Sequence, residues 1–252
     1  MDHVLFYPIG ITDSCRHCVK LLRQLGFPLT DHPSPDVTHL LLDVPSFDAT
    51  GFLKDGTDLK ELLRMLPKSL TIIGGNLNQE YLQDYPKIDL LQDPHYLAAN
   101  AAITAECALQ VAAPYLKTTF SNSPALILGW GRIGKCLAKL LAAIGCPVDV
   151  AARKETDRAM LEALGYRSVE FSKFSELLCQ YQILFNTVPD LPLHSDILDG
   201  WKDGIAIDLA SYPGMKGMNV IPARGLPGKF APESSGKLIA DTILRLCKEE
   251  TL

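Results

Sequence analysis

The amino-acid sequence has no apolar run that approaches the roughly 18 residues needed to span a bilayer, and no run of basic residues. Its 24 Lys and Arg against 29 Asp and Glu give a formal charge of -5, which does not indicate a surface for nucleic acid. The N-terminus, with Asp2, Pro8 and Gly10, does not fit a signal peptide. We therefore expect a cytoplasmic protein whose partners include neither a membrane nor a nucleic acid.

The cysteines do not indicate a disulfide framework, because there are seven of them and they are scattered through apolar contexts. Cys15-Arg16-His17-Cys18 has the spacing of a zinc or redox motif. A structural zinc site would need a second pair of ligands, which the sequence lacks, and we predict no metal site. A redox role would need a reactive thiolate at a helix N-terminus. The simpler interpretation is two cysteines on one helix.

Short β-like runs alternate with amphipathic stretches along the first third of the chain. The runs lie at 4–9, 37–44 and 70–75, and the helical stretches at 14–26 and 58–66. This alternation predicts a parallel sheet covered by helices, and we expect a flavodoxin-like fold. We place this N-terminal substrate domain at 1–96, joined by the last helix at 234–252.

A second alternation follows a long Ala-rich stretch without glycine, which predicts an interdomain helix over 97–116. Its β-like runs and helices lie at 125–129, 132–144, 147–152, 156–164, 182–188 and 204–210. We expect a Rossmann dinucleotide-binding domain over 97–233. The fold class is therefore α/β, with two doubly wound parallel-sheet domains.

Gly129-Trp130-Gly131-Arg132-Ile133-Gly134 follows an apolar run and opens a helix, which is the context of a dinucleotide-binding turn. The first glycine permits the tight turn, the second lets a pyrophosphate approach the backbone, and the third allows close packing of helix against strand. Amides at the helix N-terminus would then meet the phosphates.

The next strand lacks the acidic residue that binds the ribose 2′-hydroxyl of NAD. It ends instead in Ala151, Ala152 and Arg153, followed by Lys154, while Asp149 lies too early in the strand. A planar guanidinium suits the 2′-phosphate of NADP, so we predict NADP in preference to NAD. The alternative is a solvated loop cation.

Two later strands also end in polar residues. Ligands of open parallel sheets bind at the carboxyl ends of the strands, so these residues should approach the nicotinamide end of the cofactor. They are Asn186, Thr187, Val188 and Pro189 after one strand, and Asp208 and Ser211 after the other. The alternative is simple turn chemistry.

Several of these segments together resemble the dipicolinate synthase family, in its A-type subunit, a Rossmann-type protein of spore-forming bacteria. The segments are "GLPGKFAPESSGKLIADTIL" (225–244), "IDLASYPG" (207–214), "NTVP" (186–189), "VAAR" (150–153), "LGWGRIG" (128–134) and "NAAITAE" (100–106). The family's Gly-Gly-Asp-x-Arg element appears only as "GITDSCRH" (10–17), and Met215 replaces the second glycine of its Pro-Gly turn.

The resemblance implies oxidation of dihydrodipicolinate, a cyclic dicarboxylate, to dipicolinate with reduction of a nicotinamide cofactor. It also implies a flavoprotein-like second subunit, and we expect a homo-oligomer. Carried over by motif, Asn100, Thr104 and Glu106 match the family's Asn and Thr-x-Glu, and Asp208 and Ser211 match its Asp-Leu-Ala-Ser.

The reaction removes a hydride and a proton, so it needs one base. Glu106 is our candidate, on the interdomain helix at a cleft where desolvation would make a carboxylate more basic. Thr104 would share that cleft only at a helix end or bend, and the alternative for Glu106 is an exposed charge or an interdomain salt bridge. Lys229, Ser234 and Ser235, at the start of the last helix, are candidates for the substrate carboxylates, unless they form a plain helix cap.

Two other functions stay open. A D-2-hydroxyacid dehydrogenase shares the two-domain plan, but its catalytic Arg would stand where this chain has Ala210 and Ser211, and no His follows His194 to serve as its late His. A non-catalytic subunit that binds or senses NAD(P) would fit the cofactor motif equally well. Turnover by the purified chain would separate the catalytic from the non-catalytic interpretation.

Overall fold

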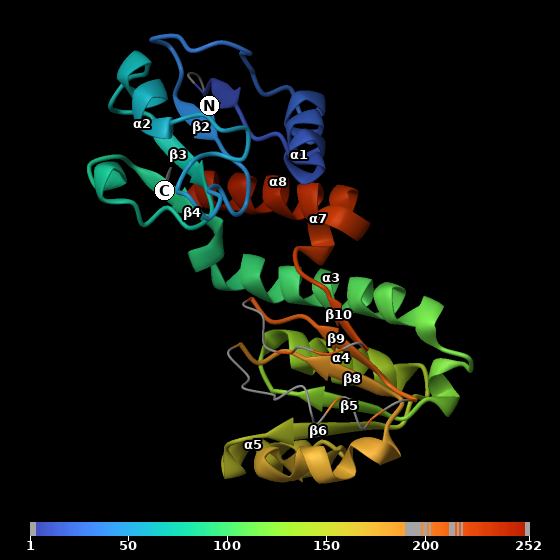
Figure 1. Ribbon diagram of the computed structural model, residues 1–252. Coiled ribbons are helices and arrows are strands. Elements are labelled where there is room, and N and C mark those ends of the chain that lie inside the picture. The colour runs from blue at the N-terminus through green and yellow to red at the C-terminus, as the bar shows by residue number, and fades with distance from the viewer. Residues whose placement is uncertain are drawn as a thin grey trace. The chain divides into compact units, whose positions relative to one another are not determined.

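The computed structural model describes residues 4–189, 198, 201, 203–211, 215, 217 and 219–249. The chain divides into two compact units, Met1–Asn100 with Pro227–Leu252, and Ala101–Leu226 (Figure 1). The sequence predicted these boundaries after residues 96 and 233, whereas the structure has them after residues 100 and 226. His194 and the Tyr212-Pro213-Gly214 turn lie outside the described residues.

The first unit contains a parallel four-stranded sheet in the order β1 (Phe6–Pro8), β2 (His39–Leu41), β3 (Thr71–Gly74) and β4 (Lys87–Asp89). Leu29 forms an isolated parallel bridge with Phe6, next to β1. If this bridge is counted as a minimal second strand, the order becomes the flavodoxin-like 2-1-3-4-5. The expected fold class is confirmed for this unit.

Helices connect these strands and include the C-terminal part of the chain. They are α1 (Asp13–Gln24), α2 (Leu59–Leu62), the short 3-10 helices η1 (Leu63–Met65), η2 (Glu80–Leu82) and η3 (Leu90–Gln92), then α7 (Leu226–Phe230) and α8 (Pro232–Glu249). The C-terminal helix α8 packs beside α1 (Figure 1). At Gly236 an added Cβ would lie 2.6 Å from the Cβ of His17, so only glycine allows this approach.

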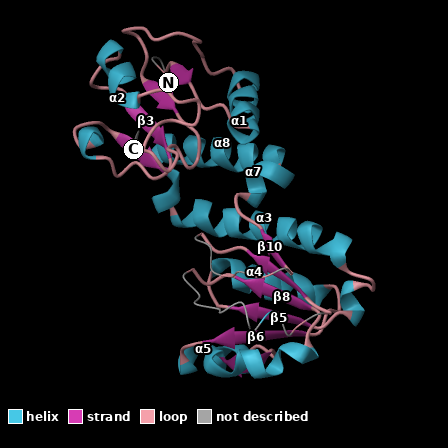
Figure 2. Ribbon diagram, in the orientation of Figure 1, coloured by secondary structure: helices cyan, strands magenta, loops and turns pink. Residues whose placement is uncertain are grey.

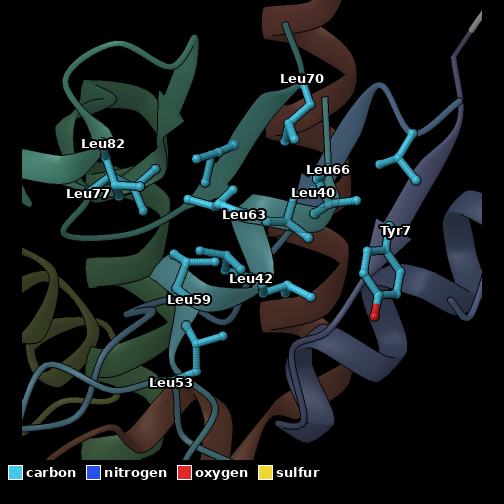
Figure 3. Close-up of a cluster of buried hydrophobic side chains, with 13 residues drawn as sticks. Tyr7, Leu40, Leu42, Leu53, Leu59, Leu63, Leu66, Leu70, Leu77 and Leu82 are labelled. Atoms are coloured by element: carbon cyan, nitrogen blue, oxygen red, sulfur yellow. The ribbon is translucent and has the colours of Figure 1, made fainter. Parts of the chain in front are cut away.

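Strand alternation gives this sheet two apolar faces. One face contributes Tyr7, Leu40 and Ile72 to a leucine-rich cluster with α2 and its flanking loops (Figure 3). The neighbouring residues Phe6, Leu41 and Ile73 pack on the opposite face with α1 and α8. Because successive side chains of a strand point to opposite faces, the continuous apolar runs of this segment fit a sheet buried on both sides.

The second unit contains a parallel six-stranded sheet (Figure 2). Its order is β10 (Val220–Pro222), β9 (Ile205–Asp208), β8 (Ile183–Asn186), β5 (Ala125–Leu128), β6 (Val148–Ala152) and β7 (Arg167–Glu170). Numbered along the chain within this unit, the order is 3-2-1-4-5-6 when read from β7, which is the Rossmann arrangement. The order reverses between β5 and β8, where the fold places its ligand crevice.

The helices of this unit are α3 (Pro94–Ala112), which crosses the division between the units, η4 (Ala113–Tyr115), η5 (Phe120–Asn122), α4 (Arg132–Ala143), α5 (Glu155–Ala163) and η6 (Phe171–Gln180). One face of the sheet packs on Phe174, Leu178, Tyr181 and Trp201. The expected alternation of strands with helices is confirmed from β5 to β8, where the structure adds β7 and η6 to the predicted elements.

Two helices begin two or more residues earlier than the sequence predicts. The helix α3 begins at Pro94 and not at residue 97, because the Asp93 carboxylate accepts a hydrogen bond from the Tyr96 amide at 2.6 Å and proline suits the first helical position. It also ends at Ala112, before the predicted residue 116. The last helix begins at Pro232 and not at Ser234.

Candidate functional site

The glycine turn has the geometry of a dinucleotide site. Gly129 has a φ of +102°, and a Cβ there would meet Thr187 Oγ1 at 2.6 Å. A Cβ on Gly134 would lie 2.2 Å from the Gly129 carbonyl oxygen, so this glycine sets the close approach of α4 to the turn. Around Gly131 nothing lies within 4 Å of such an atom. The open space at Gly131 is where a diphosphate can approach the backbone.

The N-terminus of α4 opens onto this space. Gly131 is its N-cap, and no side chain caps the helix. The amides of the first turn, which includes Arg132 and Ile133, therefore have neither an intrahelical acceptor nor a side-chain cap. Their partial positive charge favours an anion.

A cavity of about 270 Å³ lies beside the turn. Its walls come from the ends of three strands and from the two segments after β6 and β7. The lining residues are Gly129, Trp130, Gly131, Ala152, Arg153, Lys154, Asp157, Phe171, Thr187, Val188 and Pro189. The structure thus brings together eight of the twelve residues predicted to bind the cofactor, and it adds Asp157 and Phe171, which the sequence reasoning missed.

No carboxylate occupies the end of β6. Asp149 lies near the start of the strand, where its carboxylate accepts a hydrogen bond from the Tyr181 hydroxyl at 2.6 Å and pairs with Arg167 at 3.1 Å. Burial, followed by this bond to the carboxylate, raises the pKa of Tyr181. Asp149 is therefore engaged in a structural network, as its early position in the strand indicated.

The first residues after β6 are cationic and exposed. The guanidinium carbon of Arg153 lies 4.9 Å from the centre of the Phe171 ring, and Lys154 follows as the N-cap of α5. Arg158 donates hydrogen bonds to the carbonyl oxygens of Ala152 at 3.1 Å and of Arg153 at 2.9 Å. Arg158 therefore fixes the backbone that carries Arg153.

The segment after β8 is held by buried polar groups. The Asn186 amide donates to Asp208 Oδ1 at 2.8 Å, and Asn186 Oδ1 accepts a hydrogen bond from the Val188 amide at 3.0 Å. Thr187 donates from its hydroxyl to the Leu128 carbonyl oxygen at 2.8 Å. Asn186 and Asp208 are almost fully buried, with 0% and 2% exposure. Both side chains are therefore shielded from solvent, whereas Thr187 and Val188 line the cavity.

Asp208 also contacts a cation on β10's side of the sheet. Arg224 lies 3.7 Å from Asp208 Oδ2 and donates from Nε to the Ala210 carbonyl oxygen at 3.0 Å. Ser211, which sequence reasoning grouped with Asp208, is exposed. The two predicted catalytic residues of this strand end therefore have different environments.

The helix α3 carries the other catalytic candidates but does not bring them to one side. It runs unbroken through Thr104 and Glu106, so their side chains diverge by about 200° at 100° per residue. Thr104 is buried and Glu106 is exposed. The sequence analysis expected the two residues to share a cleft only at a helix end or bend, and α3 has neither at these positions. Asn100 lies one turn before Thr104, in the first unit.

The residues near the C-terminal helix that are candidates for binding the substrate belong to the first unit. Lys229 is exposed at the end of α7, and Ser234 is exposed in the first turn of α8. Ser235 is buried, and its amide donates to the Ala231 carbonyl oxygen at 2.9 Å. Because the helix starts two residues earlier than expected, the Ser235 amide is not available to an anion.

The loop after β1 is organised by a carboxylate that sequence reasoning missed. Asp43, 4% exposed and two residues beyond the end of β2, accepts hydrogen bonds from the amides of Ile11 and Thr12 at 3.0 Å each, and from the Thr12 hydroxyl. Thr12 in turn caps α1. The signal for this role was an acidic residue near the end of the β-like run at 37–44.

Cys15 and Cys18 are both buried in the apolar core beneath α1. Burial, with the charge of Asp43 as a smaller cause, raises the pKa of Cys15 to about 12, and burial also raises the pKa of Cys18. A redox motif needs the opposite shift, so the structure favours two core cysteines on one helix. Within the described residues no group of three or more His, Cys, Asp or Glu side chains could hold a metal ion.

Comparisons with known proteins agree with this geometry. Residues 96–200 match the family model of the D-isomer specific 2-hydroxyacid dehydrogenase NAD-binding domain. The A-type subunit of dipicolinate synthase from Bacillus subtilis (strain 168) is 29% identical over 159 residues, which span 60% of this chain and 54% of that relative. The aligned part thus spans about half the length of this curated relative.

Two solved structures show the same fold. The A-type subunit of dipicolinate synthase from Bacillus halodurans has a TM-score of 0.83 at 21% identity, with 97% of each chain covered. The corresponding subunit from Bacillus subtilis has a TM-score of 0.80 at 20% identity, covering 99% of this chain and 97% of that chain. The resemblance that the motifs indicate is confirmed, and the second unit has the NAD-binding fold of the dehydrogenases. Among the described residues, no helix is long and apolar enough to cross a membrane.

Proposed function

We propose that this chain is an NADP-preferring oxidoreductase that converts dihydrodipicolinate, or a closely related cyclic dicarboxylate, to its aromatic form. The observation that carries the cofactor choice is the end of β6, where Arg153 lies over Phe171 inside the cavity beside the glycine turn. The substrate class rests on the similarity to the A-type subunit of dipicolinate synthase.

The residues of the turn fit a dinucleotide. The space at Gly131 and the amides at the start of α4 would hold the diphosphate, and Arg153 with Lys154 would hold the ribose 2′-phosphate. Thr187 and Val188 would lie against the nicotinamide half, positioned by the buried Asn186 and Asp208. The nicotinamide ring supplies hydride acceptance when it is bound.

Aromatisation of a dihydropyridine removes two hydrogens. One would leave with its electron pair as a hydride, for which bound NADP would be the acceptor, and the other would leave as a proton. We assign the proton to the Glu106 carboxylate, which is exposed on α3 and free to meet a ligand. Thr104 is buried, so we give it no direct part in this step.

The substrate carries two carboxylates that need cations or donors. Lys229 and Ser234 are exposed around the start of α8, and both can contact an anion. Asn100 and Ser211 are further polar candidates from the matched motifs. Ser235 is buried, so we leave it outside the contact set.

We also propose that the chain works with a second subunit, as the name of its relative indicates for that protein, and that it forms a homo-oligomer in the cytoplasm. A non-catalytic subunit that binds NADP is the second candidate, because the cofactor site lies in one unit and could function without the substrate residues of the other.

The test is the absorbance of reduced nicotinamide when the purified chain meets freshly generated dihydrodipicolinate and NADP or NAD. Arg153→Ala tests the cofactor contact, and Arg64→Ala, an exposed arginine of the first unit that pairs with Glu61, is its matched control. Glu106→Gln tests the base, with the exposed Glu176→Gln as control.

Turnover with NADP, lost in Glu106→Gln and weakened in Arg153→Ala through a raised KM, supports the proposal. Removal of a bidentate phosphate contact is worth about 1.5 to 3 kcal/mol, so we expect KM for NADP to rise at least tenfold. Cofactor binding without turnover, and without rescue by a candidate second subunit, would support the non-catalytic alternative.

A further inference from the structure

The segments after β6 and β7 meet because of strand register. These strands pair in parallel, with Ala152 opposite Glu170. The residues that directly follow the two strands, Arg153 and Phe171, therefore leave the sheet at the same edge. The guanidinium carbon of Arg153 lies 4.9 Å from the centre of the Phe171 ring, within the range of a cation-π contact.

The Phe171 ring is a fixed platform. It is half-buried, packs against the apolar cluster of the second unit, and lies 5.5 Å from the Phe174 ring at an interplanar angle of 57°. Phe174 itself is 6% exposed. Arg153, in contrast, is an exposed long side chain that would sample many rotamers without this contact. The platform therefore limits where the guanidinium can go.

The charges around the pair leave the guanidinium available. Arg153 forms no ion pair with any carboxylate in the described part of the chain. The neighbouring Glu170 is engaged by Lys173 at 2.9 Å and by the Ser172 hydroxyl at 2.9 Å. Asp157 lines the same cavity and opposes the positive charge of Arg153 and Lys154. The position of the guanidinium, more than the net charge of the cavity, must therefore favour a phosphate.

Stacking uses the flat face of a guanidinium and leaves the N–H groups in its plane, which bind phosphate oxygens in pairs. We infer that Phe171 is a positioning residue of the cofactor site, and that its ring holds Arg153 where it can bind a phosphate on the ribose 2′ position. This inference rests on the proposed NADP preference. Phe171 thereby sets how strongly the chain discriminates between cofactors with and without that phosphate.

The test uses 2′,5′-ADP and 5′-AMP, which differ only in the 2′-phosphate. Binding of each to the full-length chain is measured by isothermal titration calorimetry for the wild type, Phe171→Leu, Phe171→Tyr, Arg153→Ala and the Phe171→Leu/Arg153→Ala double variant. Leucine keeps apolar packing without a ring, and tyrosine keeps the ring. Circular dichroism melting of each variant checks that the second unit is folded.

We expect Phe171→Leu to weaken the binding of 2′,5′-ADP by about 2- to 5-fold, which is the range of an exposed cation-π contact. The affinity for 5′-AMP should stay unchanged. Phe171→Tyr should retain the wild-type preference, and the double variant should be no weaker than Arg153→Ala alone. The inference is overturned if Phe171→Leu leaves the preference unchanged or weakens both ligands equally. A wild type without any preference would overturn the proposed use of NADP and this inference together.

Discussion

The third glycine of the turn gives a prediction whose size follows from the structure. A Cβ at Gly134 would lie 2.2 Å from the Gly129 carbonyl oxygen, whereas real Cβ contacts are essentially never under 3.0 Å. Gly134→Ala must therefore move α4 away from the turn by about 0.8 Å. Overpacking of this kind costs about 1 to 3 kcal/mol. We expect the melting temperature to fall by about 3 to 10 °C and cofactor binding to weaken with it.

The second glycine should behave in the opposite way. Gly131 has a φ of -82° and a ψ of -169°, which an alanine adopts without strain, and nothing lies within 4 Å of its would-be Cβ. The Gly131→Ala variant should lose less than about 1 kcal/mol of unfolding free energy, the cost of a poorer N-cap residue. A methyl group there would occupy the space for the diphosphate, so we expect NADP to bind at least about tenfold more weakly.

Differential scanning calorimetry and titration with NADP measure these two effects in the same preparations. Gly131→Ala should melt within about 4 °C of the wild type and bind NADP more weakly, while Gly134→Ala should lose both stability and binding. Wild-type NADP affinity in Gly131→Ala would refute the assignment of that space to a diphosphate. An unchanged melting temperature in Gly134→Ala would refute the packing argument.

Three other sites give predictions from single contacts. Asp43→Ala should destabilise the first unit by about 2 to 4 kcal/mol, because the Asp43 carboxylate accepts three hydrogen bonds from the loop after β1. Hydrogen exchange should show that this loop opens first in the variant, and unchanged protection of its amides would contradict the role of Asp43 in holding the loop. Iodoacetamide at pH 8 should modify the exposed Cys179 and spare Cys15 and Cys18, since burial raises the pKa of Cys15 to about 12; mass spectrometry of the folded chain checks this. Asn186→Ala should weaken NADP binding and lower the melting temperature, because it leaves buried partners unsatisfied; a variant with intact binding would show that the segment after β8 is held by other contacts.

The sequence predicted the central strands of both sheets and missed three of the four edge strands. The central strands of the second sheet, such as β5 and β8, are continuous apolar runs that pattern analysis detects. The strands β4, β7 and β10 were missed, and each lies at an edge of its sheet. The strands β4 and β7 carry polar residues such as Lys87 and Arg167, and β10 is only three residues long, so none of them gives a clear apolar pattern.

The glycine turn and the missing acid at the end of β6 were readable from the sequence because the motif is local. The partner of Arg153 was not, because Phe171 is 18 positions away and meets it only through the pairing of β6 with β7. The available signal was an aromatic residue, Phe171, directly after β7. The sequence analysis did not predict β7, so it could not use this signal. The start of the last helix also changed the set of candidate residues. Because α8 begins at Pro232, the Ser235 amide donates a hydrogen bond within the helix and is not available to a ligand.

The choice between NADP and NAD is decided by the affinity of the purified chain for each, determined by titration calorimetry under one buffer condition. We predict binding of both, with NADP tighter by about tenfold or more because the 2′-phosphate gains the Arg153 guanidinium. We also predict that Arg153→Ala brings the two affinities close together. Equal or tighter binding of NAD by the wild type would contradict the assignment of this site to NADP.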